Sequence, residues 1–191
     1  MKKLLNPFVY YSGGITLAVG LIGMAAMVAA AYATGQTFRS IISLGVGERS
    51  WLQLAGHLFV GWLLFSAILY GAARLFSPSR IRIIDIAGNQ ALAKLPGLPL
   101  LLATAAISDP LFDNPAQFEQ LSIAEMMAHV LSVKIILASI AAMALLVWFF
   151  CWSWLGFSIA ANLRGGKSVG IYIGCYLLAE VLAAFCLPLL R

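Results

Sequence analysis

Long apolar runs with few charges constrain this chain more than any other feature. The first run has no charged residue between Leu4 and Phe38. A helix needs about 20 mostly apolar residues to cross a hydrocarbon core about 30 Å thick. The chain is 62% apolar and only 10% charged, whereas about 25% of a soluble domain is charged. The sequence therefore predicts a multi-pass integral membrane protein. Four runs are long enough to cross, at residues 15–34, 51–73, 133–157 and 169–190.

A fifth run, at about residues 91–107, is shorter and contains Pro96 and Pro99. Proline is tolerated in a membrane-spanning helix when neighbouring groups satisfy the freed carbonyls. Lys94 lies near the start of this run, from where its ammonium group can reach the lipid headgroups. We therefore count the run as the third of five spans. The predicted fold is an all-α bundle of five transmembrane helices, forming a single integral membrane domain over residues 1–191.

The basic residues fall unequally on the two sides of these five helices. Eight lie in segments on the side of the N-terminus, and four lie on the opposite side. The side that is richer in lysine and arginine faces the cytoplasm. The sequence thus predicts a protein of the cell inner membrane, with a cytoplasmic N-terminus and an outside C-terminus. The eight are Lys2, Lys3, Arg74, Arg80, Arg82, Lys94, Arg164 and Lys167, and the four are Arg39, Arg49, Lys134 and Arg191.

The N-terminal segment has two interpretations. A basic start, MKKLLNPF, precedes an apolar run that ends in Ala31-Tyr32-Ala33, as in a secretory signal with a cleavage site of small residues. The run is longer than the usual signal core of about 7–15 residues, which favours a retained helix. Cleavage would leave Thr34 outside, so both interpretations give the same orientation.

A polar segment separates the second run from the third. Arg82, Asp85 and Asn89 recur at i, i+3 and i+7, which places them on one stripe of a helix. The pattern predicts a short amphipathic helix in the cytoplasmic interface, followed by a bend into the third span. We call this segment the elbow, and its polar and bend-forming residues are Arg82, Asp85, Asn89, Gln90, Lys94 and Pro96.

Part of this segment, IDIAGNQALAKLPGLPLLL at residues 84–102, carries a family resemblance. With five closely spaced helices and a basic connection after the second, the chain resembles bacterial members of the Yip family of small membrane proteins. The D-L-Y-G-P segment and soluble N-terminal region of eukaryotic members are missing. The resemblance implies a non-enzymatic protein that acts through helix packing, lipid contact or protein partners in membrane organisation or trafficking-like roles.

Two ionisable residues lie inside predicted spans. Glu180 is eleven residues into the last span, about 16 Å deep, and His57 is about 9 Å deep from the other end of its own span. An intramembrane carboxylate marks a functional site by default. One hypothesis is a small proton- or cation-coupled transporter or channel that uses both residues. The other is a protonated Glu180 bonded to a neighbouring helix, with His57 satisfied near the outer interface.

Gly166, Gly170 and Gly174 form two consecutive G-x-x-x-G steps at the start of the last span. Small residues on one face let membrane helices approach closely. Because five helices offer enough internal faces, this spacing favours packing within the chain over dimerisation. The expected partners are the lipid bilayer and a second membrane protein or a second copy.

The sequence shows no pattern of a catalytic or cofactor site. It has no P-loop, dinucleotide-binding glycine pattern, nucleophile elbow or H-E-x-x-H zinc signature, and no C-x-x-C pair. The scattered basic residues argue against nucleic-acid binding. We predict neither enzymatic activity nor a metal or cofactor. Acids in the predicted outer loop lack EF-hand spacing, and the last of them fits a capping box with Ser122. They are Asp109, Asp113, Glu119 and Glu125.

Overall fold

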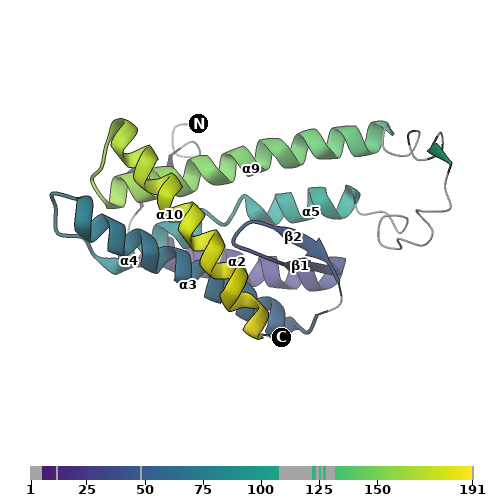
Figure 1. Cartoon of the computed structure of the whole chain (residues 1–191), viewed down its shortest axis with the longest axis horizontal. Coiled ribbons are helices and arrows are strands. Elements are labelled where there is room, and N and C mark those ends of the chain that lie inside the picture. The colour runs from purple at the N-terminus through teal and green to yellow at the C-terminus, as the bar shows by residue number, and fades with distance from the viewer. Residues whose placement is uncertain are drawn as a thin grey trace.

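Four long helices dominate the computed structural model (Figure 1). Each is long and apolar enough to cross a membrane, the last one up to residue 189. Their bounds match the four strongest predicted spans, which supports a membrane protein. They are α2 (Gly14–Thr34), α3 (Trp51–Phe76), α9 (Val133–Ala160) and α10 (Gly165–Cys186), and short 3-10 helices lie at Pro7–Val9 and Leu187–Leu190. The structure describes residues 6–11, 13–47, 49–107, 122, 123, 125, 127 and 132–190; Asp109, Asp113 and Glu119 lie outside this set.

Serine hydroxyls cap the starts of two long helices, α3 and α9. Ser50 caps α3 in a reciprocal box, in which the Gln53 amide donates to the Ser50 hydroxyl at 3.3 Å and Ser50 N–H donates back to the Gln53 side chain at 3.1 Å. The predicted box at Ser122 and Glu125 is confirmed by a 2.9 Å bond from Ser122 N–H to the carboxylate. The Ser122 hydroxyl and amide also lower the pKa of the exposed Glu125 carboxyl.

A β-hairpin, which the sequence analysis missed, joins α2 to α3. Strand β1 (Gln36–Phe38) pairs antiparallel with β2 (Leu44–Val46). The hairpin can start at once because Gly35 ends α2 in the left-handed conformation, with φ at 66°. In Figure 1 the hairpin turns back over the bundle instead of extending away from it. The predicted all-α class is confirmed, with this short hairpin as the one addition among the described residues.

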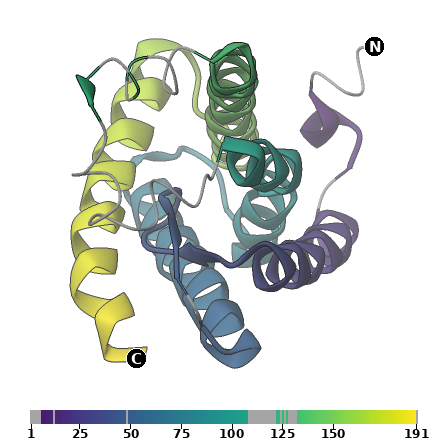
Figure 2. The same ribbon diagram turned by 90° about the vertical axis from the view of Figure 1, so that its right-hand side faces the viewer.

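The predicted third span, residues 91–107, is not one helix, because it covers the end of α4 (Ile83–Leu92), a break and then α5 (Gly97–Ile107). Tight turns replace the helix between them, where Leu95 N–H bonds Leu92 O at 3.1 Å and Gly97 N–H bonds Lys94 O at 2.8 Å. Both α2 and α9 contact α4 and also α5, so the two short helices lie end to end along them. Viewed from its right-hand side, the bundle shows α5 between α9 and α2 (Figure 2).

Helix α4 lies in the centre of the bundle, which corrects the prediction of an interfacial elbow. It contacts α2, α3 and α9, and its second half is buried. A Cβ on Gly20 of α2 would overlap the backbone of Ala91, and one on Gly88 would lie 2.6 Å from the Thr16 hydroxyl. These glycines let α2 and α4 approach closely. Of the predicted polar stripe, Asn89 is buried against protein, whereas Asp85 is half-buried and Arg82, which precedes α4, is exposed.

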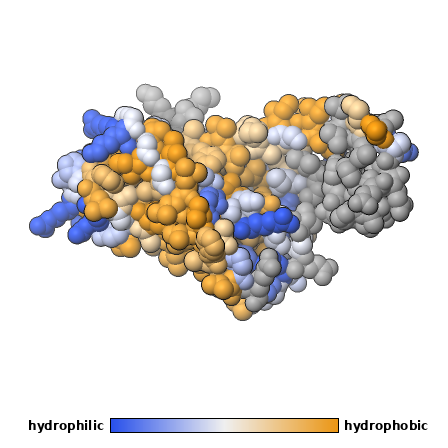
Figure 3. Space-filling model, in the orientation of Figure 1, coloured by the Kyte–Doolittle hydropathy of each residue, from blue (hydrophilic) through white to orange (hydrophobic). Residues whose placement is uncertain are grey.

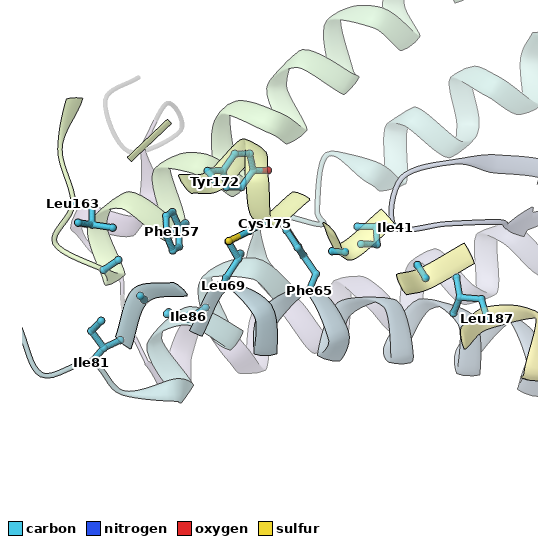
Figure 4. Close-up of a cluster of buried hydrophobic side chains, with 14 residues drawn as sticks. Ile41, Phe65, Leu69, Ile81, Ile86, Phe157, Leu163, Tyr172, Cys175 and Leu187 are labelled. Atoms are coloured by element: carbon cyan, nitrogen blue, oxygen red, sulfur yellow. The ribbon is translucent and has the colours of Figure 1, made fainter. Parts of the chain in front are cut away.

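Fourteen buried apolar residues form a core cluster, to which α3, α9, α10 and the tip of the hairpin contribute (Figure 4). Among them Phe65 stacks edge-on with Tyr172 at 6.0 Å between ring centroids. Apolar side chains also cover much of the outer face in Figure 3. On α10, Leu177, Val181 and Phe185 are exposed. Such a surface suits contact with lipid.

Candidate functional site

Lys94 lies in the break between α4 and α5 and is only 4% exposed. Its Nζ donates to the backbone oxygen of Ile41 at 2.7 Å and lies 5.3 Å from the centre of the Phe149 ring. The prediction that Lys94 reaches the headgroups is wrong, because the hairpin tip folds over it. A buried cation is costly, and it requires partners that favour its charge.

The hairpin tip supplies one such partner. Ile41 is 5% exposed and belongs to the core cluster, so its carbonyl oxygen is held inside the protein. Beside Lys94 is a small cavity of about 30 Å³, and its wall includes Met27, Phe38 and Leu58. This volume is sufficient for one water molecule, which needs at least about 10–15 Å³. The break therefore has room for hydration next to the ammonium group.

Glu180 on α10 supplies the second partner. Its carboxylate accepts a 2.7 Å hydrogen bond from the Tyr176 hydroxyl, and in its ionised form it would favour the charge of the Lys94 ammonium. The described residues show no direct ion pair between Glu180 and Lys94, so the attraction acts over a longer distance. Glu180 is half-buried, as expected for a carboxylate on a packed apolar helix.

His57 lies on the other side of the hairpin. Its Nδ1 is 2.8 Å from Phe38 O, and its Nε2 is 3.0 Å from the Arg49 guanidinium. Arginine only donates, so Nε2 accepts and Nδ1 carries the proton donated to Phe38 O. The sequence predicts that His57 and Glu180 can approach each other inside the membrane, but among the described residues no hydrogen bond joins them. His57 and Lys94 instead hold two carbonyls of the same hairpin.

A cleft of about 540 Å³ lies at the base of the hairpin, where α2 ends and α3 begins. Gln36, Arg49 and Gln53 are among its lining residues. Because Arg49 also bonds His57, polar groups continue from this cleft to the hairpin and on to Lys94. These groups are far apart in the sequence, and only the hairpin brings them near one another.

The other elbow residues differ in burial, which increases from Arg82 at the start of the segment toward Asn89 and Gln90. Asn89 donates to Gly156 O at 3.0 Å, and Gln90 donates to Ser153 O at 2.9 Å, both on α9. Pro96 is buried in the turn, whereas Asp85 is half-buried and Arg82 exposed. The side-chain oxygen of Asn89 has no hydrogen-bond partner. These amides join α4 to α9 and do not face the headgroups.

The glycine repeat of α10 makes no close helix contact among the residues that the structure describes. A Cβ on Gly166, Gly170 or Gly174 would meet no heavy atom within 4 Å, and all three are exposed. The prediction of packing within the chain at this repeat is wrong. Close contacts instead involve other glycines, among them Gly20 of α2 and Gly88 of α4, which belong to no four-residue repeat.

Groups of three or more His, Cys, Asp or Glu side chains arranged to hold a metal ion are absent from the described residues. No family model, curated protein or solved structure matches the chain.

Proposed function

We propose that the chain crosses the membrane five times, with α4 and α5 together forming an interrupted third crossing. As one continuous path, residues 83–107 extend about 37 Å, which exceeds a hydrocarbon core of about 30 Å. On this path Lys94 lies about 16 Å from the start of α4, close to the midplane. The hairpin tip reaches the same depth from the opposite side, about five extended residues, or roughly 17 Å, beyond Gln36.

The orientation follows the basic residues. The buried Lys94 no longer counts as a loop charge, yet seven basic residues remain on the N-terminal side against four on the other. That side is the cytoplasmic one in this proposal. The N-terminus then faces the cytoplasm, the C-terminus lies outside, and the membrane is the cell inner membrane.

The function that this site supports best is that of a small proton-coupled transporter. The observation that most supports this proposal is the burial of Lys94 at a helix break. Its ammonium group binds the tip of the hairpin through Ile41 O. Irregular backbone at membrane depth is tolerated only where protein buries it or where it lines a water-filled cavity. Interrupted helices at the midplane are also where transporters bind substrate and coupling ions.

Three groups in this region can bind and release a proton. His57, Lys94 and Glu180 lie on three different elements and are linked through the hairpin and through charge. A shift of the hairpin would change the partners of His57 and Lys94 together, since both bond its carbonyls. A transport cycle requires an element with two positions that change the proton-binding groups together, and the hairpin is placed to be such an element.

A second candidate is a non-enzymatic protein of the Yip type, which acts through lipids or protein partners. It is favoured by the exposed face of Gly166, Gly170 and Gly174 on α10, where another membrane helix could approach closely. The resemblance of residues 84–102 to the Yip family supports the same reading. In that case Lys94 and the hairpin only stabilise the fold.

The test is proton flux in proteoliposomes that contain equal amounts of inserted protein. Wild type should show flux above empty vesicles, and Lys94→Met and Glu180→Gln should each reduce it at least about tenfold. Lys134→Met, which removes an exposed lysine of α9, is the matched control and should behave as wild type. Absence of wild-type flux, or equal flux in Lys94→Met, would reject transport through this site and leave the second candidate.

A further inference from the structure

The end of the bundle where α3 connects to α4 carries a second cleft, of about 820 Å³. In Figure 3 hydrophilic side chains gather at this end, next to the apolar surface of the long helices. Three arginines dominate the lining, one from the last turn of α3 and two from the connection to α4. The lining residues are Arg74, Pro78, Ser79, Arg80, Ile81 and Arg82.

The three arginines are exposed, and the described residues show no carboxyl group paired with any of them. The turn from α9 into α10 reaches the same end, where Lys167 Nζ donates to Phe76 O at 3.5 Å. This turn also adds Arg164, the residue that precedes α10. Basic groups from two separate connections therefore face one region of the surface, and their field attracts anions.

Apolar side chains border the same cleft. Leu75 and Phe76 follow directly after Arg74, and they are 80% and 47% exposed. Ile83 follows Arg82 and is 56% exposed. Arginine next to exposed apolar groups at the end of a membrane-spanning helix matches the boundary between lipid headgroups and acyl chains.

We propose that this cleft binds the headgroup phosphate of an anionic phospholipid in the adjacent leaflet. Guanidinium groups bind phosphate with paired hydrogen bonds, and basic pockets between membrane helices bind anionic headgroups. A free phosphate would contact the arginines alone, whereas a lipid would also cover Leu75, Phe76 and Ile83. The exposed apolar border therefore favours the lipid as the source of the phosphate. This proposal does not depend on transport.

Binding is measured on the full chain in detergent, by titration with short-chain phosphatidylglycerol at about 150 mM salt. Arg80→Gln with Arg82→Gln removes two charges from the cleft. Arg39→Gln with Lys134→Gln removes two exposed charges that lie away from this end, on the hairpin and at the start of α9, and serves as the matched control. Each lipid-facing basic group contributes about fivefold in affinity, so the cleft variant should bind about 30-fold more weakly and the control less than about threefold.

Inorganic phosphate and short-chain phosphatidylcholine are the comparison ligands, and thermal unfolding checks that both variants are folded. Weak binding of both comparison ligands supports a lipid site. Equal losses in the two double variants would overturn the cleft in favour of a diffuse charge effect. Phosphate that competes as well as phosphatidylglycerol would overturn the lipid as its source. Leu75→Ser with Phe76→Ser should weaken lipid binding and leave phosphate binding unchanged.

Discussion

Buried polar side chains explain why a membrane protein carries so much polarity between its second and third apolar runs. Asn89, Gln90 and Lys94 each donate to a backbone carbonyl of another element. Without these carbonyls of α9 and of the hairpin tip, the two amides and the ammonium would be buried without a hydrogen-bond acceptor. In an apolar interior, a donor and acceptor that satisfy each other fix one arrangement of the helices.

The stability of Lys94→Met distinguishes a functional lysine from a structural one. The variant loses one bond to Ile41 O, at a cost of about 1–3 kcal/mol, but it also removes a buried charge whose desolvation costs several kcal/mol. We expect the unfolding free energy to stay level or to rise. Unfolding of the detergent-solubilised protein by heat and by denaturing detergent measures it. A loss above about 3 kcal/mol would instead mean that Lys94 acts as a structural clamp.

Gln90 should contribute to stability through both ends of its amide. Gln90 Nε2 donates to Ser153 O, and Ser153 Oγ donates back to Gln90 Oε1 at 2.5 Å. Gln90→Leu keeps the volume, removes the bond to Ser153 O and leaves the buried Ser153 hydroxyl without its acceptor, so we expect a loss of about 1–3 kcal/mol. A double-mutant cycle with Ser153→Ala should give a coupling above about 0.5 kcal/mol. Additive losses would show that the reciprocal bond does not contribute.

At the level of elements, the glycines of α2 and α10 give a matched comparison. Gly20→Ala puts a methyl group against the backbone of Ala91, whereas Gly170→Ala adds one in open space. We expect Gly20→Ala to lower the unfolding free energy by at least about 1–3 kcal/mol, the usual cost of overpacking. Gly170→Ala should be neutral or slightly stabilising in the monomer. Equal effects of the two substitutions would mean that α2 and α4 do not approach as closely as described.

Four spans could be predicted because length and hydropathy alone determine them. The hairpin at Gln36–Val46 could not, since it has no long apolar period and depends on the space left between α3 and α5. The periodicity of α4 was read correctly, but periodicity does not tell whether a polar stripe meets water or a row of carbonyls. The burial of Lys94 was missed for the same reason, while Glu180 could be singled out from its position in an apolar run.

On the scale of the whole molecule, the long helices differ in how much of their surface other helices cover. Helices α2, α3 and α4 form a closely packed group, whereas α9 and α10 expose long apolar rows to the surroundings. The break that holds Lys94 joins α4, which belongs to the first group, to α5, which packs against α9, so a movement of α9 relative to the first group would act on this break. In a bilayer, the exposed rows of α9 and α10 contact lipid or another membrane protein.

The number of crossings decides whether this arrangement is correct. If α4 and α5 together cross the membrane, residues before and after them face opposite sides. Single cysteines at Arg80 and Ser122, both exposed, should then react with a membrane-impermeant thiol reagent from opposite sides. The native Cys151, Cys175 and Cys186 are first replaced by alanine or serine.

In intact cells we expect labelling of Ser122→Cys and protection of Arg80→Cys, because the basic end faces the cytoplasm. Inverted membrane vesicles should give the reverse pattern. Labelling of both positions from one side would leave only the four long crossings, and Lys94 would then not lie at the midplane. Opposite labelling with the two positions exchanged would keep five crossings and reverse the orientation, which would place the arginine cleft in the outer leaflet.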